Sequence, residues 1–168
     1  MEMKKHLVGK IISGGQTGID QAALDVAIFR EIPHGGWCPR GRRSEVGEIP
    51  GTYLLKETDS RDYTVRTEKN VIDSDGTLIL FFNALSGGTR LTRKLCIQHG
   101  RPNLSIDLAL VENGADLDRV AKSNEVIDWL KKNNIQVLNI AGPRESSHEG
   151  ITKIGTTFLL NVFREPVD

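Results

Sequence analysis

A glycine-bearing loop occurs three times in the chain, each time between a short apolar run and a helical segment, and this feature limits the fold more than any other. The loops are SGGQTG at residues 13–18, SGGT at 86–89 and AGPRES at 141–146. In a parallel α/β sheet the loops that follow the strands lie at one edge, so we expect all three to share a face. Backbone N–H groups and helix N-termini at such a face suit an anionic ligand.

The rest of the chain repeats a strand–helix pattern. At residues 19–30, apolar side chains recur at i, i+3, i+4, i+7 and i+8, which is typical of one buried helix face. Residues 77–82 are continuously apolar, as in strands buried on both faces of a parallel sheet. We expect strands at 10–13, 34–39, 77–82, 103–106 and 136–140, and helices at 19–30, 62–71, 89–99, 123–133 and from about 147 onward. The pattern predicts an α/β fold with a mainly parallel central sheet.

Some details of this arrangement can also be predicted. Right-handed crossovers place the first strand beside residues 77–82, so the ligand crevice is expected between these two strands. Ser123 is positioned to cap the helix at 123–133. The helix at 62–71 is expected to have one polar face, made of Tyr63, Arg66, Thr67 and Asn70.

Length and charge narrow the classes of protein to consider. A chain of 168 residues favours a single domain over residues 1–168. Lys plus Arg equal Asp plus Glu at 22 each, and this zero net charge argues against a nucleic-acid or membrane partner. The chain shows no signal peptide, and its two cysteines have no metal or redox spacing, so we expect a cytoplasmic protein.

The three loops supply most of the candidate ligand contacts. Glycines let a ligand approach the backbone, and Gln16 and Thr17 can donate hydrogen bonds to phosphate or carbonyl oxygens. The first loop is neither a P-loop nor the G-x-G-x-x-G dinucleotide fingerprint. The candidate contacts in the loops are Gly14, Gly15, Gln16, Thr17, Gly18, Gly87, Gly88, Thr89, Gly142, Arg144 and Ser146.

Each loop also has a purely structural interpretation. The first can be a tight strand-to-helix turn, and Thr89 can cap its own helix through its hydroxyl. A serine of the third loop can cap the last helix in the same way. Arg144 has a planar guanidinium that suits phosphate or carboxylate, but it can pair with Glu145 or Asp20 instead.

The segment GGWCPRGR at residues 35–42 contains further candidates. Trp37 can stack on a base or a pterin ring, or it can pack on the core or on a subunit interface. Arg40 and Arg42 are candidate ligand contacts within a local basic patch. They can also lower the pKa of Cys38 and make a reactive thiol, whereas the alternative is an inert cysteine.

Three carboxylates are candidates for acid–base catalysis, namely Asp20, Glu45 and Glu145. A solvated carboxylate is the structural alternative. No histidine or cysteine spacing suits a metal. Residues 73–77 match the D-x-D-G-T motif of haloacid-dehalogenase-like phosphatases, but here the strand follows the motif instead of preceding it. We therefore expect a turn at the edge away from the glycine loops, with a magnesium-dependent phosphatase using Asp73 as the alternative.

Several segments together point to a known family. They are GGQTGID at 14–20, HGGWCPRGRRSE at 34–45, residues 49–58, YTVRTEKNVIDSDGTLI at 63–79, SGGTRLT at 86–92 and LNIAGPRES at 138–146. On these segments the chain resembles the putative molybdenum carrier family over nearly its full length. That family is similar to the Rossmann-like superfamily of DprA and the lysine decarboxylase-like LOG proteins. The resemblance implies a Rossmann-like three-layer α/β/α fold, a homo-oligomer (dimer or tetramer), and the molybdenum cofactor (molybdopterin) or a nucleotide as cofactor.

The LOG enzymes cleave the N-glycosidic bond of nucleoside monophosphates, and their second motif is P-G-G-x-G-T-x-x-E. In this chain Ser86 stands in place of the Pro, two residues are missing, and Thr92 stands where the Glu would be. The missing carboxylate weighs against hydrolysis. We therefore expect a binding protein for a phosphorylated small molecule, either the molybdenum cofactor or a nucleotide, with LOG-like nucleotide hydrolysis as the alternative.

Overall fold

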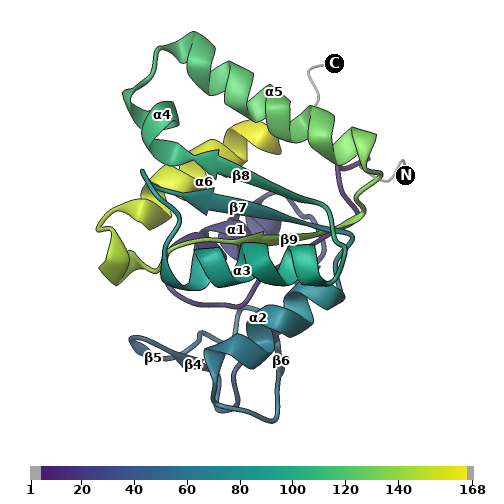
Figure 1. Ribbon diagram of the computed structural model, residues 1–168, viewed down its shortest axis with the longest axis vertical. Helices are drawn as coiled ribbons and strands as arrows, with labels where there is room; N and C mark the ends of the chain where they lie inside the picture. Colours follow the sequence, from purple (N-terminus) through teal and green to yellow (C-terminus); the bar gives the residue numbers. More distant parts are fainter. Residues whose placement is uncertain (1–4, 166–168) are drawn as a thin grey trace.

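The computed structural model describes residues 5–165, which form a parallel sheet between two layers of helices (Figure 1). The five strands lie in the order β2-β1-β9-β7-β8, and every neighbouring pair runs parallel. They are β1 (Lys10–Ile12), β2 (His34–Gly35), β7 (Gly76–Phe81), β8 (Asn103–Asp107) and β9 (Val137–Ala141). The predicted α/β fold with a parallel central sheet is confirmed, and its three layers are those of a Rossmann-like protein.

Helices cover both faces of the sheet. One layer contains α1 (Ile19–Phe29), α4 (Leu108–Asn113), α5 (Asp116–Lys132) and α6 (Ile151–Val162), which pack on one another. The other layer contains α2 (Tyr63–Ile72) and α3 (Gly87–Gln98). The main core lies between the first layer and the sheet, and it includes Ile11, Leu78, Leu80, Ile140, Phe158 and Leu159.

Strand β9 lies between β1 and β7, the two strands that the sequence pattern predicted to be neighbours. It pairs with β1 on one side and with β7 on the other, so the predicted neighbourhood of those two strands is wrong. The crossover rule fixes the hand of each connection but not how many strands the connection passes. Because Leu138 and Ile140 are both fully buried, β9 suits the centre of the sheet. The ends of three strands, not two, therefore surround the crevice.

The helix predicted at 123–133 is longer than expected. α5 begins at Asp116, so Ser123 is an interior, buried residue and does not cap the helix. The start is stabilised instead by Asp118, whose carboxylate accepts a hydrogen bond from the N–H of Ala115 at 3.1 Å. A carboxylate in the first turn also interacts favourably with the helix dipole. Ser123 faces the core because its position follows the apolar stripe of this longer helix.

The last helix begins later than predicted. Residues Glu145–Ser147 form a short 3₁₀ turn, and α6 starts at Ile151 after Gly150, which adopts a left-handed conformation with φ 87°. The serines of the third loop therefore do not cap α6. A short helix that the pattern did not predict, α4, is capped by Asp107, which accepts a hydrogen bond from the N–H of Ala109 at 3.0 Å.

Between β2 and α2 the chain leaves the sheet and forms two small ribbons. β3 (Trp37–Cys38) pairs with β6 (Lys56–Glu57), and β4 (Arg43–Ser44) forms a hairpin with β5 (Gly47–Glu48). A second, smaller core holds these ribbons against α1, and it consists of Leu24, Cys38, Ile49 and Tyr53. This packing fixes the hairpin close to the glycine loops.

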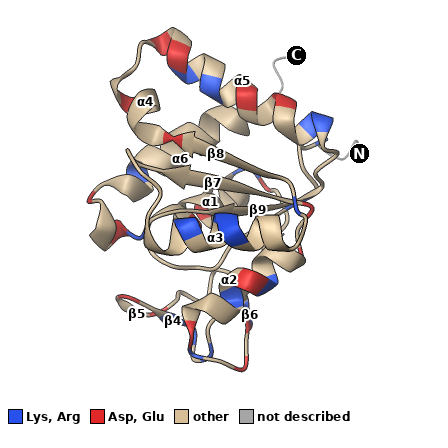
Figure 2. Ribbon diagram, viewed as in Figure 1, with Lys and Arg blue, Asp and Glu red and all other residues tan. Residues whose placement is uncertain are grey.

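Charge is unevenly distributed over the surface. Acidic and basic residues are interleaved along α5, whereas α3 carries Arg90, Arg93 and Lys94 and no acidic residue (Figure 2). Within residues 5–165, no helix is long and apolar enough to cross a membrane. The zero net charge thus still leaves locally basic regions.

Candidate functional site

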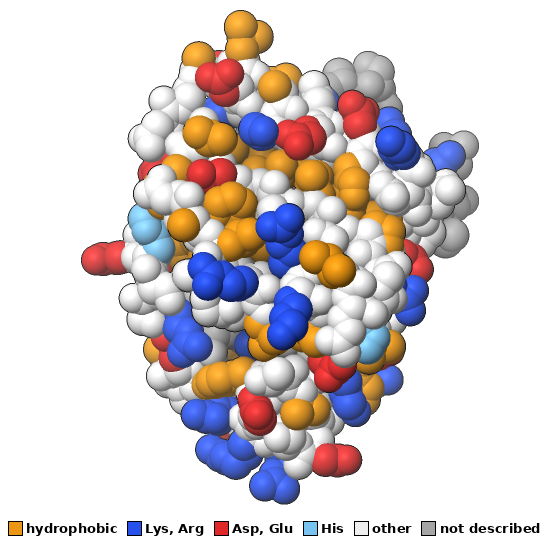
Figure 3. Space-filling view, in the orientation of Figure 1, with side chains coloured by type: hydrophobic (Ala, Val, Ile, Leu, Met, Phe, Trp, Pro, Cys, Tyr) orange, Lys and Arg blue, Asp and Glu red, His pale blue; other side chains and the backbone are white. Residues whose placement is uncertain are grey.

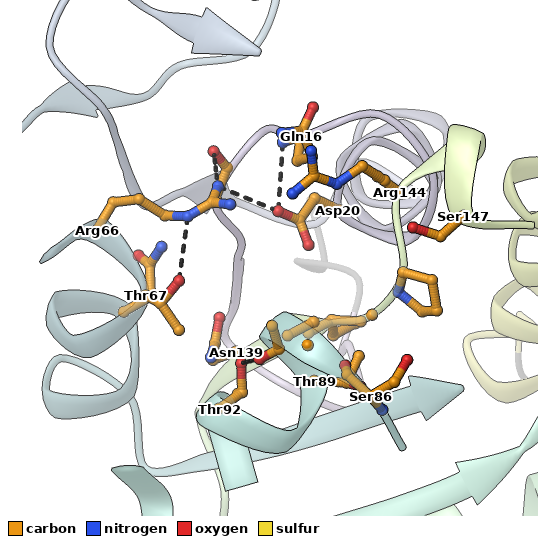
Figure 4. A pocket seen from close by; sticks show the side chains of 18 residues that line it. Gln16, Asp20, Arg66, Thr67, Ser86, Thr89, Thr92, Asn139, Arg144 and Ser147 are labelled. Atoms are coloured by element: carbon orange, nitrogen blue, oxygen red, sulfur yellow. Dashed lines mark hydrogen bonds and ion pairs between the residues drawn. The ribbon is translucent and has the colours of Figure 1, made fainter. Parts of the chain in front are cut away.

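A pocket of about 190 Å³ lies at the carboxyl ends of β1, β9 and β7, and all three glycine loops contribute to it. In Figure 4 the start of α3, with Ser86 and Thr89, faces Gln16 and Asp20 across the pocket. The lining residues are Gly14, Gln16, Asp20, Arg66, Thr67, Asn70, Ser86, Gly87, Gly88, Thr89, Thr92, Asn139, Ile140, Ala141, Gly142, Pro143, Arg144 and Ser147. The expectation that the three loops share one face is confirmed, and ligand binding there stays a prediction.

Gln16 of the first loop leaves one hydrogen-bond donor unused. Its side-chain Oε1 accepts hydrogen bonds from the N–H groups of Thr17 and Glu45, both at 3.0 Å. Its Nε2 is buried and has no partner among the described residues. A buried amide without a hydrogen-bond partner costs free energy of folding. A bound acceptor would remove this cost.

Asp20 and Arg66 form a buried ion pair in the wall of the pocket. Arg66 Nη1 lies 3.4 Å from Asp20 Oδ2, and the two side chains are only 10% and 9% exposed. Arg66 Nη1 also donates to the carbonyl oxygen of Gly14 at 2.8 Å. Desolvation raises the pKa of Asp20, and the positive charge of Arg66 opposes this shift only in part. Asp20 is therefore a carboxyl group whose proton is held more tightly than that of an ordinary aspartate.

The second loop leaves backbone donors unused at the start of α3. Within residues 5–165, the N–H groups of Gly87 and Gly88 donate no hydrogen bond. A Cβ added at Gly88 would meet nothing within 4 Å, and its φ is not positive. The fold therefore does not require glycine at this position. Glycine would instead let a ligand come close to the backbone.

The glycines of the other two loops have structural reasons to be there. A Cβ at Gly14 would overlap the guanidinium of Arg66, and one at Gly18 would overlap the carbonyl oxygen of Pro143. A Cβ at Gly142 would lie about 2.5 Å from the side chain of Ile19. Of the first loop, only Gly14 and Gln16 line the pocket, so Gly15, Thr17 and Gly18 serve the turn itself.

Thr89 lines the pocket, but its hydroxyl is used within the helix cap. Its Oγ1 accepts a hydrogen bond from the N–H of Ser86 at 3.1 Å and donates to the carbonyl oxygen of Ser86 at 2.7 Å. Thr89 therefore caps its own helix, which was the structural alternative for this residue. Its side chain shapes the start of α3 and leaves the neighbouring N–H groups to a ligand.

Glu45 joins the first and third loops. Its carboxylate accepts hydrogen bonds from the hydroxyls of Thr17 and Ser146 and from the N–H of Ser146, the last at 3.2 Å. Its side chain is 14% exposed, and its Oε2 lies 4.0 Å from Arg144 Nη1. Desolvation raises the pKa of Glu45, but these hydrogen bonds outweigh it, so the net shift is downward. Thr17, Ser146 and Glu45 thus hold the loops together, and Arg144 pairs with Glu45, not with Glu145 or Asp20.

Glu145 has a structural role at the start of α6. Its carboxylate accepts hydrogen bonds from the N–H of Gly150 at 2.7 Å and from the hydroxyl of Thr152 at 3.0 Å. It does not line the pocket. Of the three carboxylates considered for acid–base catalysis, only Asp20 lies in the pocket, because the other two satisfy donors of the loops and of α6.

Trp37, Arg40 and Arg42 do not line the pocket. Trp37 Nε1 donates to Asp73 Oδ2 at 2.7 Å, and the ammonium of Lys69 lies 4.3 Å from the centre of its ring. These contacts place Trp37 at the C-terminal end of α2, away from the carboxyl ends of the strands. Arg40 is exposed, with its N–H bonded to the carbonyl of Ser60.

The side chain of Arg42 is an anchor for the hairpin. It donates to four backbone carbonyl oxygens, among them those of Ile49, Pro50 and Tyr53 at 3.1, 2.8 and 2.9 Å. Desolvation raises the pKa of the buried Cys38, and Arg42 opposes the shift only in part. The inert-cysteine alternative therefore applies, because burial outweighs the nearby charge.

The D-x-D-G-T segment forms a turn at the opposite edge of the sheet, as expected. Asp75 Oδ2 accepts hydrogen bonds from the N–H groups of Gln136 and Val137 at 3.0 and 2.8 Å, so it links the starts of β7 and β9. In the described part of the chain, no group of three His, Cys, Asp or Glu side chains could hold a metal ion.

Seven polar lining residues are not among the candidate contacts predicted from the sequence; they are Arg66, Thr67, Asn70, Ser86, Thr92, Asn139 and Ser147. The first three belong to the polar face predicted for the helix at 62–71, and that face turns out to point to the pocket. Asn139 lies between two buried apolar residues of β9 and donates to Thr77 Oγ1 at 3.2 Å. A polar residue inside an otherwise apolar strand, beside a glycine loop, was the available signal.

Comparison with known proteins agrees with this architecture. The model of the circularly permutated YpsA SLOG family matches residues 11–163. A crystal structure described as a "Putative molybdenum carrier protein" from Syntrophus aciditrophicus SB is 44% identical, with a TM-score of 0.86, over 96% of this chain and 99% of that chain. A search of curated proteins found no match. The resemblance inferred from the motifs is thereby confirmed, and the chain belongs to the circularly permutated YpsA SLOG family.

Proposed function

We propose that the pocket binds the anionic group of a phosphorylated small molecule. The observation that carries this proposal is the open backbone at Gly87 and Gly88, where two N–H groups at a helix N-terminus have no acceptor within residues 5–165. Gln16 lines the same pocket, and its buried side-chain amide has no acceptor within residues 5–165. Arg66 and Arg144 contribute positive charge to its wall.

The size and lining of the pocket limit how a larger ligand can sit. Its volume of about 190 Å³ is below the roughly 300–1,000 Å³ of pockets that enclose whole drug-sized ligands. In the described part of the chain no aromatic side chain lines it, so a base or pterin ring would lie outside. A nucleotide or the molybdenum cofactor would therefore place its phosphate in the pocket and its ring at the mouth.

The only reason to consider molybdenum is the name of the similar protein. Soft thiolate ligands are absent from the pocket, because Cys38 and Cys96 are both buried elsewhere. The residues present fit a phosphate or a tetrahedral oxyanion, held by the N–H groups of α3 and by Gln16. Molybdate and the phosphate of the molybdenum cofactor are the forms consistent with these donors.

Thermal denaturation with inorganic phosphate, nucleoside monophosphates, molybdate and tungstate tests the proposal. At about 100 times Kd a ligand stabilises by about 2.7 kcal/mol, which raises the Tm by about 5–10 °C for a domain of this size. We expect Gly88→Ala to abolish this shift, because its Cβ would cover the N–H groups while the fold accommodates it. Gly51→Ala is the matched control, since a Cβ there also meets nothing within 4 Å and Gly51 does not line the pocket. If none of these ligands stabilises the protein, or if Gly88→Ala binds like the parent, the proposal is wrong.

A second candidate function is hydrolysis of the N-glycosidic bond of nucleoside monophosphates. The observation that favours it is Asp20, a buried carboxyl with a raised pKa in the pocket wall. In this reaction the carbon–nitrogen bond breaks and the oxygen of water bonds to the sugar carbon; Asp20 would give its proton to the leaving base, and the water would return a proton to the Asp20 carboxylate. Release of free base by the parent and by Asp20→Asn tests this role, and equal turnover of the two would exclude Asp20 as the acid.

We also propose a cytoplasmic homo-oligomer, a dimer or a tetramer, on the basis of the family resemblance. Light scattering coupled to gel filtration gives the mass in solution. A mass of one 18.6 kDa chain at micromolar concentration would count against it.

A further inference from the structure

Three guanidinium groups surround the ring of Tyr63 at the margin of the pocket. The central carbon of Arg43 lies 4.6 Å from the ring centre, that of Arg66 lies 5.4 Å away, and that of Arg144 lies 5.6 Å away. The three arginines come from β4, α2 and the third glycine loop. Because Arg66 and Arg144 also line the pocket, the ring connects the pocket wall with Arg43 outside it.

The hairpin holds Arg43 on the side of the pocket. Side chains alternate along a strand, so the exposed Arg43 lies on the opposite side of β4 from the buried Ser44. Glu45, in the turn that follows β4, bonds to the first and third glycine loops, so this end of the hairpin lies beside the pocket. Arg42 anchors the hairpin through four backbone carbonyls, so the fold fixes the backbone position of Arg43.

The protein does not use the full hydrogen-bonding capacity of these arginines. Arg66 has Asp20 as its carboxylate partner, at 3.4 Å. Arg144 is 43% exposed and reaches Glu45 only at 4.0 Å, while that carboxylate already accepts hydrogen bonds from two hydroxyls. Arg43 donates to the carbonyl of Arg61 at 3.0 Å, and no carboxylate lies within 4.0 Å of it in residues 5–165. Arg43 and Arg144 therefore both have N–H groups left for a ligand, and both lie beside the same ring.

We infer that Arg43 and Arg144, packed against Tyr63, form a second anion subsite at the pocket mouth, so that the ligand carries two phosphate-type groups. One group lies at the N-terminus of α3, and the other lies between the two arginines. The inference rests on the proposed function, because it takes the first group to be bound at Gly87 and Gly88. Figure 3 shows several Lys and Arg side chains on the part of the surface that holds β4 and β5, with Asp and Glu side chains between them. The ligand class is thus a diphosphate ester or a bisphosphorylated small molecule, not a monophosphate.

Calorimetric titration with inorganic phosphate, pyrophosphate and tripolyphosphate at constant ionic strength tests this inference. We expect one of the two longer anions to bind about tenfold or more tightly than phosphate, which is the effect of one charge-assisted hydrogen bond. Arg43→Gln is expected to remove this preference and to leave the affinity for phosphate unchanged. Arg144→Gln is a second variant with the same expected loss of preference. Arg93→Gln is the matched control, because it removes one positive charge from an exposed position on α3 that does not line the pocket.

The outcomes separate this inference from the proposed function. If phosphate and the longer anions bind the parent equally, or if Arg43→Gln and Arg144→Gln keep the preference, the second subsite is refuted and the pocket proposal stands. If Arg93→Gln loses the preference as well, general charge attraction explains it and the second subsite is refuted too. If no probe binds the parent protein, both proposals fall.

Discussion

Glu45 offers the most direct test of how the pocket is held together. Replacing it with alanine removes the acceptor for the hydroxyls of Thr17 and Ser146 and for the N–H of Ser146. Thr17 is 9% exposed, so losing the acceptor of its buried hydroxyl costs about 1–2 kcal/mol. Ser146 is more exposed and regains water, so its two bonds contribute about 0.5 kcal/mol each. The sum predicts a loss of about 2–3 kcal/mol in the free energy of unfolding.

Urea denaturation at neutral pH measures this loss. Glu48→Ala is the matched control on the same hairpin, because Glu48 is exposed and lies on β5; its effect is expected to stay within about 0.5 kcal/mol. A loss below about 0.5 kcal/mol for Glu45→Ala would refute the reasoning, since the carboxylate would then not be stabilising the two loops.

The same contacts predict a pH dependence. Desolvation raises the pKa of Glu45, but the hydrogen bonds lower it further, so the folded value lies below the ordinary 4.5. When folding lowers the pKa of a carboxyl group, the stability it contributes is present at a pH above the pKa of the unfolded state. This stability is lost as the pH falls through the pKa of the folded state. The difference in stability between the parent and Glu45→Gln should therefore be constant above about pH 5 and shrink below about pH 4. A difference that does not change with pH would show that the charge of Glu45 is not involved.

Three further predictions concern the surroundings of the pocket and are all measured by urea denaturation at neutral pH. Gly14→Ala is expected to cost about 1–3 kcal/mol, because its Cβ would displace the buried guanidinium of Arg66; a neutral effect would mean that Arg66 is mobile. Arg42→Ala is expected to cost about 2–3 kcal/mol through the loss of its bonds to backbone carbonyls; a loss under about 0.5 kcal/mol would contradict its role as the hairpin anchor. Tyr53→Phe is expected to cost about 1 kcal/mol, because its hydroxyl donates to Asp25 Oδ1 at 2.6 Å; a stabilised variant would argue against that bond.

Much of the secondary structure could be read from local patterns. The periodicity from Ile19 onward predicts a helix that the structure places at Ile19–Phe29, and the apolar run at 77–82 corresponds to β7 (Gly76–Phe81). Local patterns did not predict the strand order, because contacts between distant parts of the chain determine it. Nothing near Val137–Ala141 shows that this strand inserts between β1 and β7, because its neighbours are chosen by the core that assembles around it.

The candidate site was predictable in place but only partly in composition. Glycine loops that follow parallel strands must meet at one edge of the sheet, so their convergence could be inferred. Asp20, Glu45 and Glu145 look alike in the sequence as carboxylates near such loops. Only the folded chain shows that Glu45 binds the hydroxyl of Ser146, that Glu145 caps α6, and that Asp20 alone faces the pocket.

The sequence by itself determined the α/β alternation, the edge at which the glycine loops meet and the family to which the chain belongs. These properties depend on residue spacing and on local backbone preferences, which neighbouring residues express directly. The tertiary structure decided which polar groups are used by the protein and which are left for a ligand. Arg66 lies 46 positions from Asp20, and Glu45 lies 101 positions from Ser146, so these partners become visible only when distant segments pack together. For the same reason Gly88 and the amide of Gln16 are identified as open only in the folded protein.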